Sequence, residues 1–253
     1  MAWISTAFRS AAVNMPVEVE LLVPQPGYKS LRQTDGYKVM ILLHGANNDR
    51  TEWLLKSQIF DMVKELPILV CMPSGKNSFY VNTANGYDYM DYVAKELPEW
   101  LKTMFRVSSK RENWLIAGES MGGYGALVCG LNHPERFGQI ASFSGALDIS
   151  DMGHRLPAFR MELIFGENWQ QEIAENYNVY NYCHKVPQEL RPRLYLCCGK
   201  QDGLYDMNVQ FRNAVHGEYD LTWSEGDGGH DFGYWNERLK EMLAWFLGEE
   251  VSA

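Results

Sequence analysis

One five-residue pattern, Gly118-Glu119-Ser120-Met121-Gly122, constrains the fold more than any other part of this 253-residue sequence. A buried, β-rich run over residues 114–117 leads directly into the pattern, and small residues typical of a tightly packed helix follow over residues 122–127. A strand, a sharp turn and a helix around G-x-S-x-G form the setting that holds a serine exposed as a nucleophile. We interpret Ser120 as that nucleophile; the alternative is an ordinary glycine-rich turn between a strand and a helix.

The hydrophobic pattern predicts an α/β fold. Runs that are apolar on both faces are typical of central strands in a parallel sheet, and they are separated by segments with helical periodicity. We predict a mostly parallel sheet with helices on both faces. A segment that alternates polar and apolar residues, 17–23, is predicted to be an antiparallel edge strand. The predicted central strands are 37–43, 68–72, 114–117 and 194–198, and the predicted helices are 90–105, 121–131 and 235–247.

The chain shows no internal repeat and no linker, so we predict a single domain over residues 1–253. Residues 150–185 interrupt the alternation of strands and helices and carry many aromatic side chains. We interpret them as a helical insertion over the active site, because long excursions in compact domains often form lids or binding loops. A structural insertion whose aromatic rings pack against the core is an equally good interpretation.

Composition and charge exclude several functions. The net charge of −9, from 23 basic and 32 acidic residues, argues against nucleic acid as a partner. No apolar run approaches a membrane span, and the N-terminus lacks the features of a secretion signal. Five cysteines without C-x-x-C spacing indicate neither a metal site nor a disulfide framework. We therefore expect a cytoplasmic protein with no metal and no nucleic-acid or membrane partner.

A serine nucleophile needs a base, and His230 is the best candidate among six histidines. It lies in a glycine-rich loop before the last predicted helix, in the third position of the chain order serine, acid, histidine. The alternative for His230 is an exposed loop histidine without a catalytic role. His44 is predicted to be a structural residue of its loop.

The acid of the triad is expected after a strand that lies between the serine and the histidine. Asp202 follows the predicted strand 194–198, and its role is to orient His230 and stabilise the imidazolium. Asp206 is the competitor, although it can instead be a residue of a helix start. Asp148 is a further loop acid, but it follows an earlier strand.

The transition state of acyl transfer also needs donors for its oxyanion. One is predicted to be the backbone N–H of Met121, directly after the nucleophile. The other is predicted in the loop after the strand 37–43, where Gly45 lets the backbone turn and the N–H of Ala46 becomes the donor. Phe79, Tyr80 and Trp235 are candidates to bound a substrate pocket, and core packing is at least as good an explanation for each ring.

Three runs together resemble the esterase D family of α/β-hydrolases. A particular likeness to bacterial tributyrin esterases extends also to residues 86–89, 96–98 and 198–205. The runs are Leu42-Leu43-His44-Gly45, Gly118 to Ala126 and Ser142-Phe143-Ser144-Gly145-Ala146, and the likeness extends over about residues 8–246. The resemblance implies the α/β-hydrolase fold, a Ser120–Asp202–His230 triad and oxyanion donors at Ala46 and Met121. Glu119 departs from the family pattern, where His, Leu or an aromatic residue is typical.

We therefore predict a serine carboxylesterase that needs no cofactor and acts through an acyl-enzyme. The resemblance implies small-molecule esters with short acyl chains, including acetyl groups on sugars, and self-association into a homo-oligomer. Alternatives are a thioesterase of the S-formylglutathione hydrolase kind, an acyltransferase, or an inactive binding module on the same fold. A comparison of thioester with ester substrates tests the thioesterase. Product partitioning to an added sugar or alcohol acceptor tests the acyltransferase, and labelling of Ser120 with a fluorophosphonate tests the inactive binding module.

Overall fold

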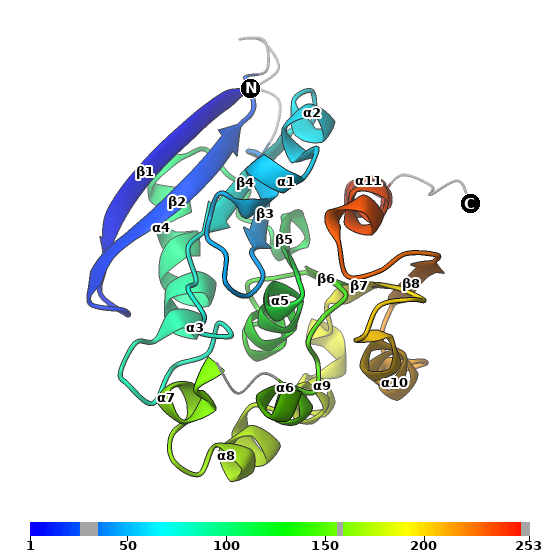
Figure 1. Cartoon of the computed structure of the whole chain (residues 1–253). Coiled ribbons are helices and arrows are strands. Elements are labelled where there is room, and N and C mark those ends of the chain that lie inside the picture. Colours follow the sequence, from blue (N-terminus) through cyan, green and yellow to red (C-terminus); the bar gives the residue numbers. More distant parts are fainter. Residues whose placement is uncertain (26–34, 156–158, 249–253) are drawn as a thin grey trace.

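An eight-stranded sheet organises the protein, seen in a computed structural model that describes residues 1–25, 35–155 and 159–248 (Figure 1). The strands lie in the order β1-β2-β4-β3-β5-β6-β7-β8. The strands are β1 (Ala2–Ser10), β2 (Met15–Val23), β3 (Lys38–Leu43), β4 (Ile68–Pro73), β5 (Trp114–Glu119), β6 (Gln139–Phe143), β7 (Arg193–Gly199) and β8 (Leu221–Gly226).

Six of the strands, β3 to β8, pair in parallel, and the two N-terminal strands are antiparallel. The predicted strand 17–23 is therefore antiparallel, as expected, but it is not the edge of the sheet. The preceding strand β1 pairs along its whole outer side, from Ala2 opposite Val23 to Ser10 opposite Met15. That outer strand is half exposed, and so it lacks the continuous apolar run that identified the central strands.

Helices cover both faces of the sheet, as the sequence predicts. The helices are α1 (Glu52–Lys56), α2 (Ile59–Val63), α3 (Tyr89–Asp91), α4 (Leu97–Met104), α5 (Met121–Asn132), α6 (Ile149–Arg155), α7 (Met161–Phe165), α8 (Trp169–Asn176), α9 (Val179–Lys185), α10 (Tyr205–Val215) and α11 (Phe232–Leu247). A π-helical segment, η2 (Tyr92–Glu96), joins α3 to α4, so the predicted helix 90–105 is one nearly continuous helical stretch. Short 3₁₀ segments in the described part of the chain include η3 (Arg111–Asn113) and η5 (Gln188–Leu190).

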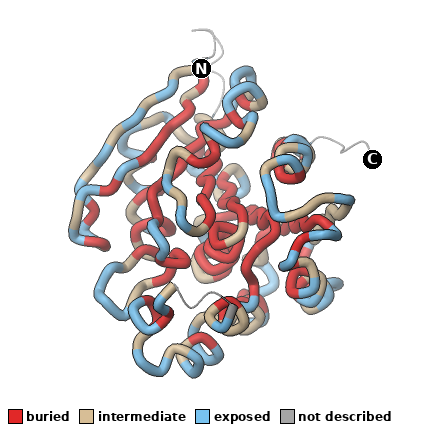
Figure 2. Tube along the Cα trace, viewed as in Figure 1, coloured by how far each residue is buried: buried red, intermediate tan, exposed pale blue. Residues whose placement is uncertain are grey.

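Alternate side chains of the central strands divide the core into two layers. Val39, Ile41 and Leu43 of β3 face the larger layer, which also holds side chains of η2, α4, α5 and α9. Met40 and Leu42 face the smaller layer, closed by α1, α2 and α11. Figure 2 shows this buried interior running through the sheet and into α5. Strands buried on both faces explain why their sequences are continuous apolar runs.

The parallel strands bring distant loops to one edge of the sheet. β3, β5, β7 and β8 all end at this edge, so the loops that follow them lie near one another. Such an edge is the usual ligand-binding side of an open α/β sheet. Helices α6 to α9 lie in the interval between β6 and β7, which contains the predicted insertion. None of the described helices has the length and apolar composition needed to cross a membrane.

Candidate active site

Ser120 occupies a strained turn between β5 and α5. Its backbone has φ 56° and ψ −116°, a conformation that is rare and costly for a residue with a side chain. Two hydrogen bonds hold the turn, from Ser120 N–H to the Phe143 carbonyl at 2.9 Å and from Ala146 N–H to the Ser120 carbonyl at 3.0 Å. Local strain held by surrounding structure is the expected property of a nucleophile elbow.

The close approach of α5 to β3 explains the glycine that follows the turn. A Cβ atom added to Gly122 would lie 2.5 Å from the Leu43 carbonyl oxygen, which is too close for any side chain. The first N–H groups of α5 have no partner within the helix, and the helix dipole makes this end favourable for negative charge. The Met121 N–H is therefore available beside Ser120.

Asp202 and His230 meet at the same edge of the sheet, although 28 residues separate them. Asp202 follows β7, and its Oδ2 lies 2.9 Å from the Nδ1 of His230, which follows β8. The Asp202 side chain is fully buried and His230 is 36% exposed, so the ring can contact both the acid and the solvent side. The second carboxylate oxygen of Asp202 accepts a hydrogen bond from Leu204 N–H at 2.8 Å.

These hydrogen bonds keep Asp202 ionised. Burial by itself would raise the pKa of the carboxyl, but the hydrogen bond and positive charge of His230 and the Leu204 N–H outweigh it, so the pKa lies below its usual value. An ionised carboxylate at Nδ1 fixes the tautomer that leaves Nε2 free to accept a proton. The arrangement therefore suits a general base held by an acid.

Trp235 on α11 fixes the other side of the histidine ring. The two rings meet edge to face with centroids 4.9 Å apart, and the indole N–H of Trp235 donates to the Ser144 hydroxyl at 3.0 Å. The ring also lines a cavity next to Ser120. Trp235 thus lies at the proposed site and at the same time belongs to the core with 4% exposure.

The competing acids lie elsewhere. Asp206 is exposed on α10, and Asp148 is exposed and accepts a hydrogen bond from the N–H of Asp151 in α6. Neither lines the cavities beside Ser120. Among residues 1–25, 35–155 and 159–248, no group of three or more side chains could hold a metal ion.

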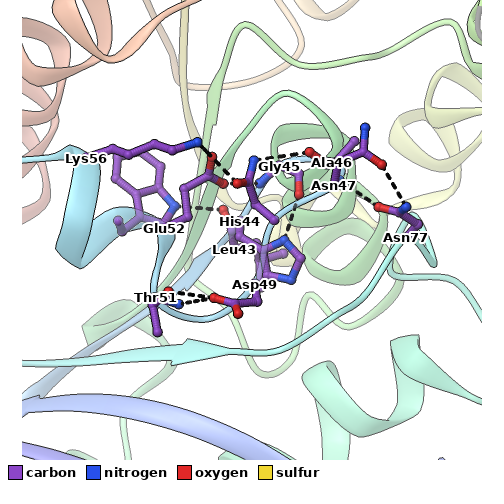
Figure 3. A network of polar contacts seen from close by, with 12 residues as sticks. Leu43, His44, Gly45, Ala46, Asn47, Asp49, Thr51, Glu52, Lys56 and Asn77 are labelled. Atoms are coloured by element: carbon purple, nitrogen blue, oxygen red, sulfur yellow. Dashed lines mark hydrogen bonds and ion pairs between the residues drawn. The ribbon is translucent and has the colours of Figure 1, made fainter.

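The loop after β3 carries Ala46 to the mouth of the site. Ala46 and Met121 line the same pocket as Ser120. His44 holds this loop from within, because its Nε2 accepts from Gly75 N–H at 2.9 Å. Its Nδ1 lies 2.7 Å from the Gly45 carbonyl (Figure 3). Nδ1 must then carry the proton, and burial lowers the pKa of this neutral ring. His44 is a structural residue, in agreement with its interpretation from the sequence.

Phe79 and Tyr80 are adjacent in sequence, but only Phe79 lies at the pocket beside Ser120. Phe79 lines the pocket, and its ring meets that of Phe159 with centroids 5.6 Å apart. Tyr80 is fully buried and does not line this pocket. Its hydroxyl donates to the His44 carbonyl at 3.0 Å, so it supports the loop instead of facing substrate. The pocket role predicted for Tyr80 is therefore wrong, because its phenol is used in a core hydrogen bond.

Two cavities of different character open on Ser120. The first, of about 250 Å³, is mostly apolar, and the second, of about 410 Å³, is the more polar of the two, with polar and charged groups beside the rings of Phe159, Phe232 and Trp235. Several of the lining residues were not predicted from the sequence. The one sequence feature that could have indicated them is their position in the loops after strands and in the insertion. The apolar cavity includes Phe79, Met121, Ala146, Met152, Phe159 and Leu204, and the polar cavity includes Asn47, Asn48, Glu52, Lys56 and Asp231.

Comparison with known proteins identifies the family. The family model described as a putative esterase matches residues 10–246. The chain belongs to this esterase family. The acetyl esterase of Caldicellulosiruptor saccharolyticus is 30% identical over 246 residues, which cover 92% of each chain.

Solved structures agree with this assignment. The fluorophosphonate-binding serine hydrolase F of Staphylococcus aureus, FphF, has a TM-score of 0.89 at 28% identity, over 97% of this chain and 98% of the other. The S-formylglutathione hydrolase FrmB of the same organism has a TM-score of 0.80 at 27% identity, over the same shares. The esterase therefore has the α/β-hydrolase fold and is a serine carboxylic ester hydrolase.

Proposed function

We propose that the esterase hydrolyses small esters with a short, apolar acyl group and a polar alcohol, through a Ser120–His230–Asp202 triad. The observation that carries the proposal is the hydrogen bond between His230 Nδ1 and buried Asp202, 2.9 Å long, in loops that line one cavity with the strained Ser120. Catalysis requires such convergence of a nucleophile, a base and an orienting acid.

The mechanism follows from these positions. Ser120 Oγ attacks the ester carbonyl carbon while His230 Nε2 takes the hydroxyl proton, and the carbonyl oxygen becomes an oxyanion bound by the N–H groups of Ala46 and Met121. Collapse of this intermediate breaks the bond to the alcohol oxygen, which receives the proton from His230. Water then attacks the acyl-enzyme with the same proton transfers and releases the carboxylic acid and free Ser120.

The two cavities suit different parts of the ester, the apolar one the acyl group and the more polar one the alcohol. An apolar pocket stabilises an acyl chain through burial, about 0.8 kcal/mol for each methylene that fits. The polar cavity offers amide groups of Asn47 and Asn48 and the ammonium of Lys56 to an alcohol rich in hydroxyls. Sugar acetates satisfy both requirements, and they are the substrates we favour.

The length of the acyl chain provides the test of this proposal. The rings of Phe79 and Phe159 line the apolar pocket and meet edge to face. If they bound the acyl chain, an added methylene must displace packed side chains at roughly 1 to 3 kcal/mol, which exceeds its burial gain. We expect kcat/KM for p-nitrophenyl esters to fall beyond about four acyl carbons, by roughly tenfold for each 1.4 kcal/mol. The series is acetate, butyrate, hexanoate and octanoate, and a steady rise through octanoate would contradict a closed pocket.

A smaller side chain at Met152 provides a second, independent prediction. Met152 of α6 lines the apolar pocket, so Met152→Ala should enlarge it and move the preferred substrate from butyrate toward hexanoate. Met104→Ala on α4 is the matched control, because Met104 is 58% exposed and lies outside the pocket. The ratio of kcat/KM for hexanoate to butyrate should rise in the first variant only. An unchanged ratio in both variants would mean that α6 does not bound the acyl chain.

A thioesterase of the S-formylglutathione hydrolase kind is the second candidate, supported by the similarity to FrmB. A direct comparison of kcat/KM for S-formylglutathione and for a sugar acetate separates the two.

The particular likeness to tributyrin esterases remains a prediction, which the same acyl series with glycerol esters tests. We also propose a cytoplasmic location, because all five cysteines are free thiols. Self-association is a further prediction, to be tested by light scattering.

A further inference from the structure

Two buried carboxyl groups meet beneath the loop that carries Ala46, and the mechanism above uses neither of them. Glu119 is the last residue of β5, directly before the nucleophile, and is 2% exposed. Glu52 lies in the first turn of α1 and is 5% exposed. Burial of a carboxylate is costly unless partners compensate it, so two neighbouring acids inside the protein require an explanation.

Glu52 is anchored by two contacts. One of its carboxylate oxygens accepts the Gly45 N–H at 2.9 Å, and the other lies 3.0 Å from the ammonium of Lys56 (Figure 3). The Gly45 N–H belongs to the residue directly before Ala46. Glu52 therefore fixes the backbone from which the proposed oxyanion donor projects.

Glu119 lies against the same residue. A Cβ atom on Gly45 would lie only 2.2 Å from Glu119 Oε1, so the carboxyl group fills the space against that residue. Glu52 binds the N–H of the same residue, so the two carboxyl groups are neighbours within reach of a shared hydrogen bond. Two carboxyl groups can share a hydrogen bond only if one of them carries a proton.

The proton belongs on Glu119. Glu52 already accepts from Gly45 and pairs with Lys56, whereas Glu119 Oε1 is buried without a hydrogen-bond partner in the described part of the chain. A neutral carboxyl tolerates such an unpaired oxygen better than a carboxylate does. Burial and the negative charge of Glu52 also raise the pKa of Glu119 well above its usual value.

We propose that Glu119 is a positioning residue, held as a neutral acid that donates to Glu52, and that this pair fixes Gly45 so that the Ala46 N–H is aimed at the oxyanion. The inference rests on the proposed oxyanion role of Ala46. It also has a consequence at high pH. Loss of the Glu119 proton removes the hydrogen bond and places a second negative charge beside the developing oxyanion, and both changes oppose the reaction.

The other titratable groups near the pair behave differently. Lys56 of α1 faces Glu52, and His230 lies across the polar cavity that Glu119 also lines. Beneath the loop, burial lowers the pKa of His44 and raises that of Tyr80 well above its usual value, so both stay neutral across the useful pH range. Lys56 is the charged neighbour of the pair, and a separate variant isolates its contribution.

The test measures the rate of Ser120 phosphonylation by a fluorophosphonate, together with kcat and KM for p-nitrophenyl acetate, between pH 6 and 10. We expect the wild-type labelling rate and kcat to fall at the alkaline end. E119A, which removes the donor and leaves a cavity, should lower kcat at least tenfold at pH 7.5 with little change in KM. E119Q, whose amide still donates to Glu52 but does not titrate, should restore most of that loss and remove the alkaline fall.

Two further variants separate the groups involved. In E52Q the negative neighbour of Glu119 is gone, so the alkaline fall should move to lower pH. K56Q should keep the fall, because Glu119 is still the titrating group. An alkaline fall that is the same in E119Q as in the wild type, or a flat wild-type profile to pH 10, would overturn the proposal.

Misfolding of a variant and a wrong choice of substrate can both be distinguished from a failure of the proposed role of Glu119. Thermal unfolding of each variant shows whether it is folded, and if E119A is unstable, the profiles of E119Q and E52Q decide. The labelling rate depends on Ser120 and its oxyanion donors but on no particular ester. If the wild type is labelled but does not hydrolyse short esters, the proposed substrate is wrong, whereas the labelling profiles still confirm or overturn the role of Glu119.

Discussion

Ser120→Ala should reduce kcat for p-nitrophenyl acetate by roughly 10⁴ to 10⁶, the range found when a serine triad loses its nucleophile. No acyl-enzyme can form without the hydroxyl, and only the binding cavity and the oxyanion donors remain to accelerate direct attack by water. The fold should survive, because the turn is held by backbone hydrogen bonds from Ser120 N–H and to its carbonyl, which alanine retains.

The control for this variant is an exposed serine outside the site. Ser109 lies on the surface before η3 and lines neither cavity next to Ser120, so Ser109→Ala should keep wild-type rates. Both variants should unfold at temperatures close to that of the wild type. If purified Ser120→Ala kept more than a tenth of the activity, another residue would have to be the nucleophile.

Asp202→Asn should have the second largest effect, a loss of kcat of roughly 10⁴. An amide in this place can donate to the Nδ1 of His230, which stabilises the tautomer with its proton on Nε2, where it cannot take the proton of Ser120. The amide also fails to stabilise the imidazolium. Asn has nearly the same shape as Asp. At this buried position, 2.9 Å from His230, the substitution therefore changes mainly the charge.

Asp206→Asn is the matched control, because it makes the same chemical change four residues further on. Asp206 is exposed in the first turn of α10 and does not line the cavities at Ser120. We expect less than a twofold change in kcat/KM for this variant. If Asp206→Asn were the more damaging substitution, the acid of the triad would have to be reassigned.

Much of the fold could be predicted, and the proposed triad could be located, because local sequence carries the relevant signals. Strands such as β5 and β7 are buried on both faces and therefore appear as continuous apolar runs. The turn at Ser120 requires glycine where α5 meets β3, which leaves a visible pattern. Because parallel strands end at one edge, the acid and the base could be sought in the loops after later strands.

The features that escaped prediction depend on partial exposure or on contacts between distant segments. Strand β8 has intermediate burial throughout, and its polar residues conceal it. The hydroxyl of Tyr80 reaches the His44 carbonyl, 36 residues away, which no local pattern reveals. Glu119 stood out as a departure from the family pattern, but its meaning appears only when α1 brings Glu52 and Lys56 beneath the same loop.

Mass spectrometry of the protein after reaction with a fluorophosphonate tests the central claim most directly. The serine oxygen forms a bond to phosphorus and fluoride leaves, so each active molecule gains one phosphonyl group. We predict a single adduct, mapped by peptide digestion to Ser120, which forms quickly in the wild type, slowly in Asp202→Asn and not at all in Ser120→Ala. An adduct on a different residue, or equal labelling of Ser120→Ala, would contradict the assignment of Ser120 as the nucleophile.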